Sequence, residues 1–298
     1  MKLGFAILLT AALATLVGCS DQEPALPLSS QSGFADVTPD GRHGLIVGER
    51  QVGTDSTETV VYIVDIVDLH GATYHIADSV TGNIGDAALL TDTTMVFAQV
   101  TNETTRMMAA SLSNLSSARE LTRIDTVPPR VSVCPGETHV AYREPAGWTL
   151  RELGGDEEIE RFMDAVTSGG FTRDCRAFIG IVNDFAGDDQ TKEWRSWLVR
   201  YQTDGSGLDT LVEVQSAFGR PVAETADSPV YFLSSMPDFT AANVWKYDPS
   251  TRELTAVTDM QPPDFVSIFH LVGDSLAVLQ RDPSQPPEAQ YTCQMYSK

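Results

Sequence analysis

The feature that most constrains the fold is a short unit, a polar turn followed at once by an apolar run, that recurs along the chain. Its first copy is "VTPDGRHGLIVG", in which Thr38-Pro39-Asp40-Gly41 forms the turn. Pro, Asp and Gly are typical of tight turns because each favours a backbone conformation that a turn needs. Further copies follow about 40 to 50 residues apart, at Thr91–Val100, Cys134–Glu144, Thr172–Val182, Glu224–Ser234 and Leu271–Gln280. The chain therefore contains six units.

Each unit continues with further short runs that are rich in β-branched and aromatic residues. Examples are "VVYIVDI" (Val60–Ile66), "SWLVRY" (Ser196–Tyr201) and "NVWKYD" (Asn243–Asp248). Apolar runs joined by Asp, Gly and Pro turns predict β-hairpins. Only Asp156–Val166 has the periodicity of a helix. Four short strands in each of six units predict an all-β chain, a six-bladed β-propeller of four-stranded antiparallel blades.

A ring of blades has to close. One four-stranded sheet cannot bury both of its faces alone, so each blade must pack against two neighbours. The last unit is short by one strand, because the chain stops at "YTCQMYSK". We therefore expect residues Ala25–Ser30 to supply the missing outer strand of the last blade.

The N-terminus carries a targeting signal. Lys2 precedes an apolar run from Leu3 to Val17, which is too short to span a bilayer comfortably and is typical of an export signal. The run ends in Leu16-Val17-Gly18-Cys19, which resembles the lipobox of bacterial lipoproteins. That resemblance implies cleavage after residue 18 and lipidation of Cys19. Ser20 follows the cysteine, which in lipoproteins of Gram-negative bacteria implies the outer membrane, facing the periplasm or the cell surface.

The remaining chain divides into a tether and one domain. "QEPALPLSSQSG", from Gln22 to Gly33, is polar and rich in Pro and Ser, a composition that favours an extended linker. We predict a lipoprotein signal peptide over residues 1–18, a lipidated cysteine with a flexible tether over 19–32, and the propeller over 33–298.

The first turn carries a family resemblance. Thr38-Pro39-Asp40-Gly41 is similar to the turn of the TolB-like propeller repeat, an aromatic-Ser-Pro-Asp-Gly sequence before an apolar strand, whereas Cys134-Pro135 and Asp174 match it in part. The resemblance implies six blades and a periplasmic binding role in envelope complexes. The chain departs from TolB itself in its lipobox and in lacking the α/β domain that precedes the propeller there.

Three cysteines lie in the predicted propeller. Cys134 and Cys175 occupy corresponding turns of consecutive units, and Cys293 lies near the C-terminus. Neighbouring blades converge at such turns, and export exposes thiols to an oxidising compartment. Cys134 and Cys175 are therefore either a disulfide or two buried free thiols. A structural zinc site is not expected, because the chain has no C-x-x-C pair.

No catalytic constellation is visible. The chain has neither a G-x-S-x-G elbow nor an H-E-x-x-H pair. His43 and His139 follow the turns of their units and are candidates for ligand binding at the mouth of a central tunnel. Weaker candidates for metal binding are His70 and His75 with Asp65 and Asp68, and an acidic loop, Asn183–Glu193, that could take Ca²⁺. Trp194, Trp197 and Trp245 are assigned to packing between blades, and no other cofactor is predicted.

The charge of the chain bounds its partners. A net charge of −21 repels nucleic acid and anionic lipid, so membrane contact is expected only through the lipid anchor. It suits a cationic partner. The leading hypothesis is a lipid-anchored, non-catalytic propeller that binds a cell-envelope protein, another macromolecule or a ligand. The alternative is a metal-dependent lyase or hydrolase acting on glycans or lactones, with its site at the tunnel.

Overall fold

The structure is a computed structural model that describes residues 26–27, 34–52, 56–69, 72–101, 104–125, 130–136, 138–144, 147–153, 158–161, 166–184, 195–235, 241–261, 264–286 and 291–298. The predicted signal peptide, Cys19 and most of the predicted tether lie outside these residues. The described ranges form strands and turns only. None of them provides a helix of the length and hydropathy needed to cross a bilayer.

The strands form six antiparallel sheets, numbered here as blades in chain order. Blade 1 contains β1 (Leu26–Pro27), β2 (Phe34–Val37), β3 (His43–Val52), β4 (Ser56–Asp68) and β5 (Thr73–Gly82). Blade 2 contains β6 (Ile84–Leu89), β7 (Thr94–Val100), β8 (Thr105–Ser111) and β9 (Asn114–Ile124). Blade 3 contains β10 (Val131–Val133), β11 (His139–Glu144), β12 (Gly147–Glu152) and β13 (Glu158–Arg161). Blade 4 contains β14 (Val166–Phe171), β15 (Ala177–Asp184), β16 (Arg195–Gln202) and β17 (Leu208–Gln215). Blade 5 contains β18 (Ala217–Val222), β19 (Val230–Ser234), β20 (Asn243–Asp248) and β21 (Glu253–Ala256), and blade 6 contains β22 (Phe265–Val272), β23 (Ser275–Arg281) and β24 (Tyr291–Ser297).

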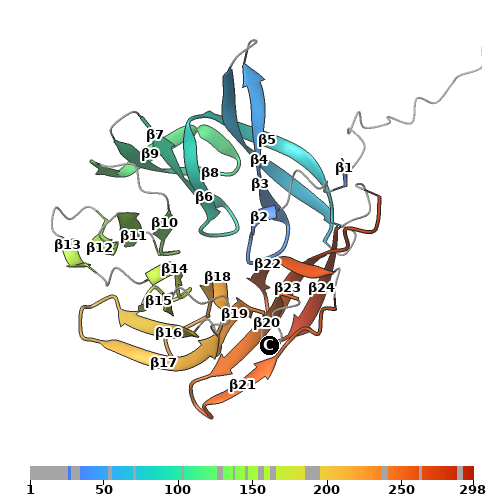
Figure 1. Ribbon diagram of the computed structural model, residues 1–298. Helices are drawn as coiled ribbons and strands as arrows, with labels where there is room; N and C mark the ends of the chain where they lie inside the picture. Colours follow the sequence, from blue (N-terminus) through green and yellow to red (C-terminus); the bar gives the residue numbers. More distant parts are fainter. Residues whose placement is uncertain are drawn as a thin grey trace, which may run out of the picture.

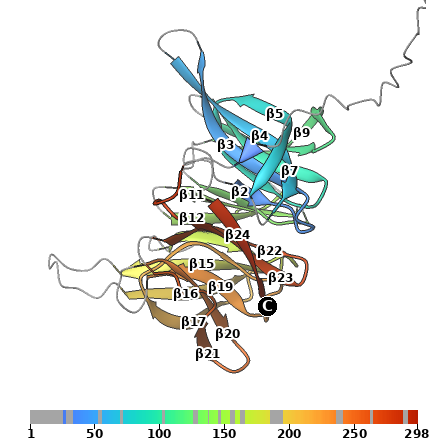
Figure 2. The ribbon, with the colours of Figure 1, turned by 90° about the vertical axis from the view of Figure 1, so that its right-hand side faces the viewer.

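The blades are arranged as a ring. Figure 1 looks down the ring, and the first full strand of each blade (β2, β6, β10, β14, β18 and β22) faces the centre. In the view turned by 90°, the paired strands β3 and β4 rise away from the rest of blade 1 (Figure 2). The predicted fold class, an all-β six-bladed propeller, is confirmed.

The core lies between the blades rather than in one central cluster. The buried apolar residues fall into six groups, and each group joins two consecutive blades. The seam between blades 3 and 4, for example, joins Trp148 of β12 to Phe178 of β15, with ring centroids 5.1 Å apart. Each blade thus buries both faces on its neighbours, which is how a sheet that cannot fold alone becomes stable.

The polar turns that open the units of blades 1 and 4 share one geometry. The Thr38 hydroxyl donates to Asp40 Oδ1 at 2.7 Å, and the Thr38 N–H donates to the His43 carbonyl at 2.9 Å. In blade 4, Thr172 donates in the same way to Asp174 (2.6 Å) and to the Ala177 carbonyl (2.9 Å). The similarity of the units is therefore structural even where the Pro-Asp-Gly sequence has been lost.

The closure of the ring differs from the expectation. Blade 6 has three described strands, and residues Ala25–Ser30 were expected to complete it. The two described residues of that segment do not: Leu26 and Pro27 pair with Tyr74 and Thr73 of β5. The N-terminal segment therefore extends blade 1. The seam between blades 6 and 1 is held by side-chain packing, in which Cys293 and Tyr291 meet Tyr74 and its neighbours.

The one predicted helix is also wrong. Within Asp156–Val166 the structure has a strand, β13, which pairs with β12 through Thr149↔Arg161 and Leu150↔Glu160. Backbone hydrogen bonds to the blade outweigh the local helical pattern, because an outer strand gains its pairing from its neighbour whatever its own propensity. The tryptophan prediction is confirmed for Trp197 and Trp245, which pack in the seams between blades 3 and 4 and between blades 4 and 5. Trp194 lies outside the described residues.

Candidate functional site

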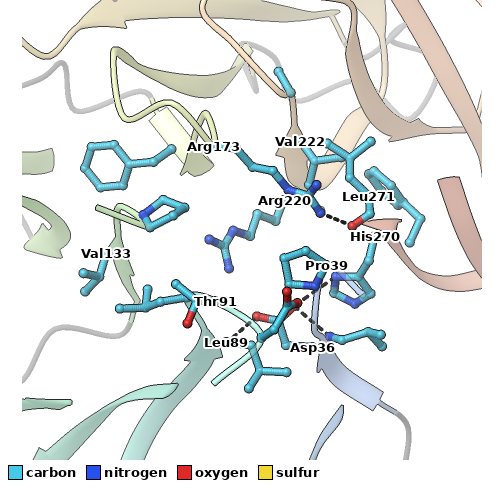
Figure 3. A pocket seen from close by; sticks show the side chains of 18 of the residues that line it. Asp36, Pro39, Leu89, Thr91, Val133, Arg173, Arg220, Val222, His270 and Leu271 are labelled. Carbon is cyan, nitrogen blue, oxygen red and sulfur yellow. Dashed lines mark hydrogen bonds and ion pairs between the residues drawn. The ribbon is translucent and has the colours of Figure 1, made fainter. Parts of the chain in front are cut away.

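A cavity of about 500 Å³ lies on the axis of the ring. All six blades contribute to its lining through their innermost strands and the turns that follow, with one residue from β19: Asp36, Val37, Pro39, Leu89, Leu90, Thr91, Asp92, Val133, Pro135, Phe171, Arg173, Gly219, Arg220, Val222, Ala223, Leu233, Phe269, His270 and Leu271. Figure 3 shows that apolar side chains make most of the wall and that Arg220 projects between them.

Asp36 is the buried acidic group of this wall. Its Oδ1 accepts hydrogen bonds from its neighbour Val37 N–H (2.9 Å) and lies 3.0 Å from His270 Nδ1, while its Oδ2 accepts from Leu89 N–H at 2.8 Å. These contacts join blade 1 to blades 6 and 2. Burial is the largest influence on the pKa of Asp36 and acts to raise it, but His270, the nearby Arg220 charge and the Leu89 N–H together hold that pKa below its usual value.

His270 presents one occupied and one unoccupied nitrogen. Its Nδ1 faces the Asp36 carboxylate, and its side chain is 16% exposed. Its Nε2 is buried and has no hydrogen-bond partner among the described residues. Buried polar atoms of native proteins nearly always have a partner, so this nitrogen is an exception in the wall of the cavity.

Arg173 is fully engaged within the protein. Its Nη1 lies 3.1 Å from Glu224 Oε1, and its Nη2 donates to the Leu271 carbonyl. Lys298 Nζ binds the same Glu224 carboxylate. This network joins blades 4, 5 and 6 at one end of the cavity, so the charge of Arg173 is balanced by structure.

Arg220 is not balanced in this way. It lies in a bulge of β18, where Gly219, Arg220 and Pro221 stand between the register pairs Phe218↔Leu233 and Val222↔Tyr231. Its guanidinium contacts the Ser132 hydroxyl of blade 3 at 3.4 Å. Within the described chain no carboxylate lies within ion-pair distance of it, and the side chain is exposed inside the cavity.

The position of Arg220 depends on a glycine of the preceding blade, blade 4. A Cβ atom at Gly170 of β14 would come within 2.8 Å of Arg220 Nε and 3.1 Å of its Cγ. Glycine at this position therefore lets the arginine stem pass along β14 toward the axis. Bulges that redirect a side chain in this way are enriched beside functional sites.

The sequence-predicted candidates lie elsewhere. Neither His43 nor His139 is among the residues that line the cavity. His43 Nδ1 lies 2.9 Å from Asp65 of β4, and His139 Nδ1 lies 2.8 Å from the Thr138 hydroxyl. A ligand-binding role for the two histidines stays a prediction, and the histidine of the cavity is His270.

The weaker metal candidates are divided between described and undescribed segments. His75 is the register partner of Asp65, whereas His70 and most of the acidic loop Asn183–Glu193 lie outside the described residues. No group of three or more His, Cys, Asp or Glu with metal-binding geometry occurs within the described ranges.

Cys134 and Cys175 are brought together, as their matching turns predicted. Both are free thiols in this structure, and they pack in the same cluster at the seam between blades 3 and 4. The disulfide itself stays a prediction. Cys293 is a buried free thiol in the seam between blades 6 and 1, where burial raises its pKa to about 11.

Comparison with known proteins supports the fold. No family model matches the chain, and no curated protein matches it by sequence. The chain is similar in structure to the β-propeller domain of the Trilobed protease from Pyrococcus furiosus, at 12% identity and a TM-score of 0.50, over 90% of this chain and 94% of that one. That domain is described as having an open velcro topology, and here too no described strand is shared between blades 6 and 1.

Two further likenesses come from proteins of different kinds. TolB from Acinetobacter baumannii is matched at 10% identity and a TM-score of 0.50, over 85% of this chain and 66% of that one. Oligogalacturonate lyase from Vibrio parahaemolyticus is matched at 13% identity and a TM-score of 0.52, over 85% of this chain and 70% of that one. The chain is thus a six-bladed propeller with TolB-like neighbours, of a fold that both enzymes and other proteins use.

Proposed function

We propose that this chain is a non-catalytic binding propeller that takes a ligand with an apolar body and a carboxylate group in its axial cavity. The observation that carries this proposal is the Arg220 guanidinium, which is exposed within an apolar-walled cavity and has no carboxylate partner among the described residues. A planar guanidinium binds a carboxylate through two parallel hydrogen bonds, which favours this anion over others of similar size.

The cavity suits a small organic ligand or the end of a peptide. Its volume of about 500 Å³ falls within the range of ligand sites. Phe171, Phe269 and Leu89 supply apolar wall. A ligand that fills this space displaces water from around Arg220, which strengthens the attraction between the guanidinium and the ligand's charge.

The acidic composition of the chain makes an arginine without an ion pair unusual. The protein has 41 acidic and 20 basic residues, so an arginine without a carboxylate partner is not a by-product of excess basic charge. Asp36 acts on Arg220 only from beyond ion-pair distance, so a ligand carboxylate can bind the guanidinium directly.

We infer binding rather than catalysis from the roles of the polar lining residues. Asp36 is held ionised by its contacts, and Arg173 is held by Glu224. A general acid needs a pKa near the working pH, whereas the pKa of Asp36 is shifted away from it. Metal analysis of the purified protein tests the alternative of a metal-dependent lyase or hydrolase: a stoichiometric divalent ion would favour the enzyme.

The ligand class is tested with a matched pair of probes. N-acetyl-Leu-Phe with a free C-terminal carboxylate is compared with its C-terminal amide by isothermal titration. We expect the acid to bind about 10- to 100-fold more tightly, because a hydrogen-bonded charge pair contributes a binding free energy that corresponds to this factor. Arg220→Gln should remove that difference, and Arg106→Gln, an exposed arginine paired with Glu120 on blade 2, should preserve it. Equal binding of acid and amide to the wild-type protein would refute the carboxylate proposal.

We also propose that the propeller is held at the outer membrane through lipidated Cys19. The support is the lipobox-like sequence before that cysteine, which lies outside the described residues. Cys19→Ser should move the protein from the membrane fraction to the soluble periplasmic fraction and abolish incorporation of labelled palmitate. Retention of Cys19→Ser in the membrane fraction would contradict the anchor.

The outer surface suits a cationic envelope partner, because the net charge is −21. Such binding is expected to weaken steeply with added salt, since exposed charge pairs are screened by ions.

A further inference from the structure

Turns of neighbouring units are joined to one another at the rim of the axial cavity. The Asp40 N–H donates to Asp92 of blade 2 at 2.9 Å, and the Gly273 N–H of blade 6 donates to the Pro39 carbonyl at 2.8 Å. Between blades 4 and 5, the Arg173 N–H donates to the Ala223 carbonyl at 3.1 Å. At these three seams the rim is held by nitrogen-to-oxygen hydrogen bonds.

The seam between blades 3 and 4 is joined through sulfur instead. The Gly136 N–H donates to Cys175 Sγ at 3.0 Å, and Cys175 packs against the cluster that contains Cys134. Cys134 is completely buried, whereas Cys175 is partly exposed at the rim. One thiol is thus within reach of solvent and the other lies directly behind it.

Cys175 occupies a position that disfavours a side chain. Its φ is +58°, and the equivalent residue of the blade 1 turn is Gly41, with a φ of +72°. A residue with a Cβ atom is strained in this conformation relative to glycine. The strained position carries a sulfur atom that contacts Gly136 of the preceding blade, blade 3. A glycine could not make this contact.

Cys134 occupies the place of the threonine that begins the blade 1 turn. The Cys134 N–H donates to the His139 carbonyl at 3.0 Å, as Thr38 does to His43. Its sulfur lies 3.1 Å from the Thr138 hydroxyl and accepts from the Thr138 N–H at 3.4 Å. The hydrogen bond from Cys175, followed by those from Thr138, lowers the pKa of Cys134 to about 5 despite its burial, whereas the pKa of Cys175 is raised. The pair is therefore arranged to hold one thiolate.

We propose that Cys134 and Cys175 are a redox site, a dithiol that is oxidised to a disulfide and then fastens blade 3 to blade 4 at the cavity rim. The oxidant is a low-molecular-weight disulfide. The proton that the pair shares first passes from Cys175 to Cys134. The exposed Cys175 sulfur, now the thiolate, attacks one sulfur of the oxidant and releases the other as a thiolate. Cys134 then gives up this proton to the released thiolate, and its own thiolate attacks Cys175 Sγ and releases the second oxidant sulfur. In total the two cysteines lose two protons and two electrons, and the oxidant becomes two thiols.

The bond would act on the cavity through its neighbours. Pro135 follows Cys134 directly and Arg173 lies two residues before Cys175, and both line the cavity. The proposal does not depend on the carboxylate ligand, because it concerns the seam and not the occupant of the cavity.

The test is a thiol map of the full-length protein after incubation with oxidised glutathione. We expect a disulfide-linked pair of peptides that contain Cys134 and Cys175, with Cys293 still free for alkylation. Cys293→Ser is the matched control and should give the same linked pair. Cys175→Gly gives the blade 4 turn the glycine that the blade 1 turn has at the equivalent position, Gly41. The variant should therefore fold and leave Cys134 unlinked.

The thermal midpoint supplies a second measurement. The oxidised wild-type protein should melt roughly 5–10 °C above the reduced protein, the shift expected for a disulfide of this loop length, and Cys175→Gly should show no difference between the two conditions. Either of two results would overturn the proposal: both thiols still open to alkylation after oxidised glutathione, or a link from either of them to Cys293.

Discussion

Asp36→Ala is expected to lower the free energy of unfolding by about 3–5 kcal/mol, because it removes a buried carboxylate and leaves its hydrogen-bond partners unsatisfied. The carboxylate joins three blades, because it lies on β2 and accepts from Leu89 of β6 and contacts His270 of β22. Its side chain is 11% exposed. The alanine variant would leave the Leu89 N–H and His270 Nδ1 without their hydrogen-bond partner at a site that is mostly shielded from water, which destabilises the fold.

The contribution of Asp36 has a defined pH dependence. Its pKa is lower in the folded protein than the value of about 3.9 expected in an unfolded chain. A group of this kind stabilises the fold fully above its unfolded pKa, and the contribution is lost as pH falls through the folded pKa. The difference in stability between wild type and Asp36→Ala should therefore be present at pH 5 and shrink below about pH 4.

Urea unfolding at several pH values measures both effects. Glu120→Ala is the matched control, because Glu120 lies 3.8 Å from Arg106 on an exposed face where a pair contributes about 1 kcal/mol or less. If Asp36→Ala cost no more than Glu120→Ala at pH 7, Asp36 would not be the link between blades that the structure indicates.

Trp148→Ala is expected to cost a similar 3–5 kcal/mol or so, because it removes a large side chain from the seam between blades 3 and 4. Trp148 is 1% exposed and packs against Phe178 and Val166. Its Nε1–H donates to the Val166 carbonyl of the next blade at 3.1 Å. The variant therefore loses packing and leaves an unpaired carbonyl in the same seam.

Chemical denaturation compares this variant with Leu208→Ala. Leu208 is 43% exposed on β17, and its substitution should change stability by less than about 0.5 kcal/mol. A small loss for Trp148→Ala, near that of Leu208→Ala, would show that the blades do not depend on burial against one another.

Much of the fold could be predicted from the sequence because its information is local. The Thr38-Pro39-Asp40-Gly41 turn specifies its own hydrogen bonds, and each alternating run specifies a strand. The number of repeats then gives the number of blades. Each blade must pack on its neighbours, because a four-stranded sheet cannot bury both of its faces alone. The outer strands were harder to assign, because β13 and β1 take their pairing from a neighbouring strand rather than from their own residues.

The site could not be predicted in the same way. Asp36, Arg220 and His270 come from blades 1, 5 and 6, and their proximity depends on how the ring packs. A local signal does exist: each is the one strongly polar residue of its kind within a short inner strand, as in "FADV", "AFGRPV" and "FVSIFHLV". His43 and His139 were selected instead because they follow the turns, but the second strand of a blade lies one step away from the axis.

The central claim is that Arg220 binds the carboxylate of a ligand within the axial cavity. A crystal structure of the full-length protein with N-acetyl-Leu-Phe tests it most directly. The account predicts the ligand carboxylate in paired hydrogen bonds with the Arg220 guanidinium, and its side chains against Phe171 and Phe269. A ligand bound on the outer surface, or in the cavity with its carboxylate turned away from Arg220, would contradict the account.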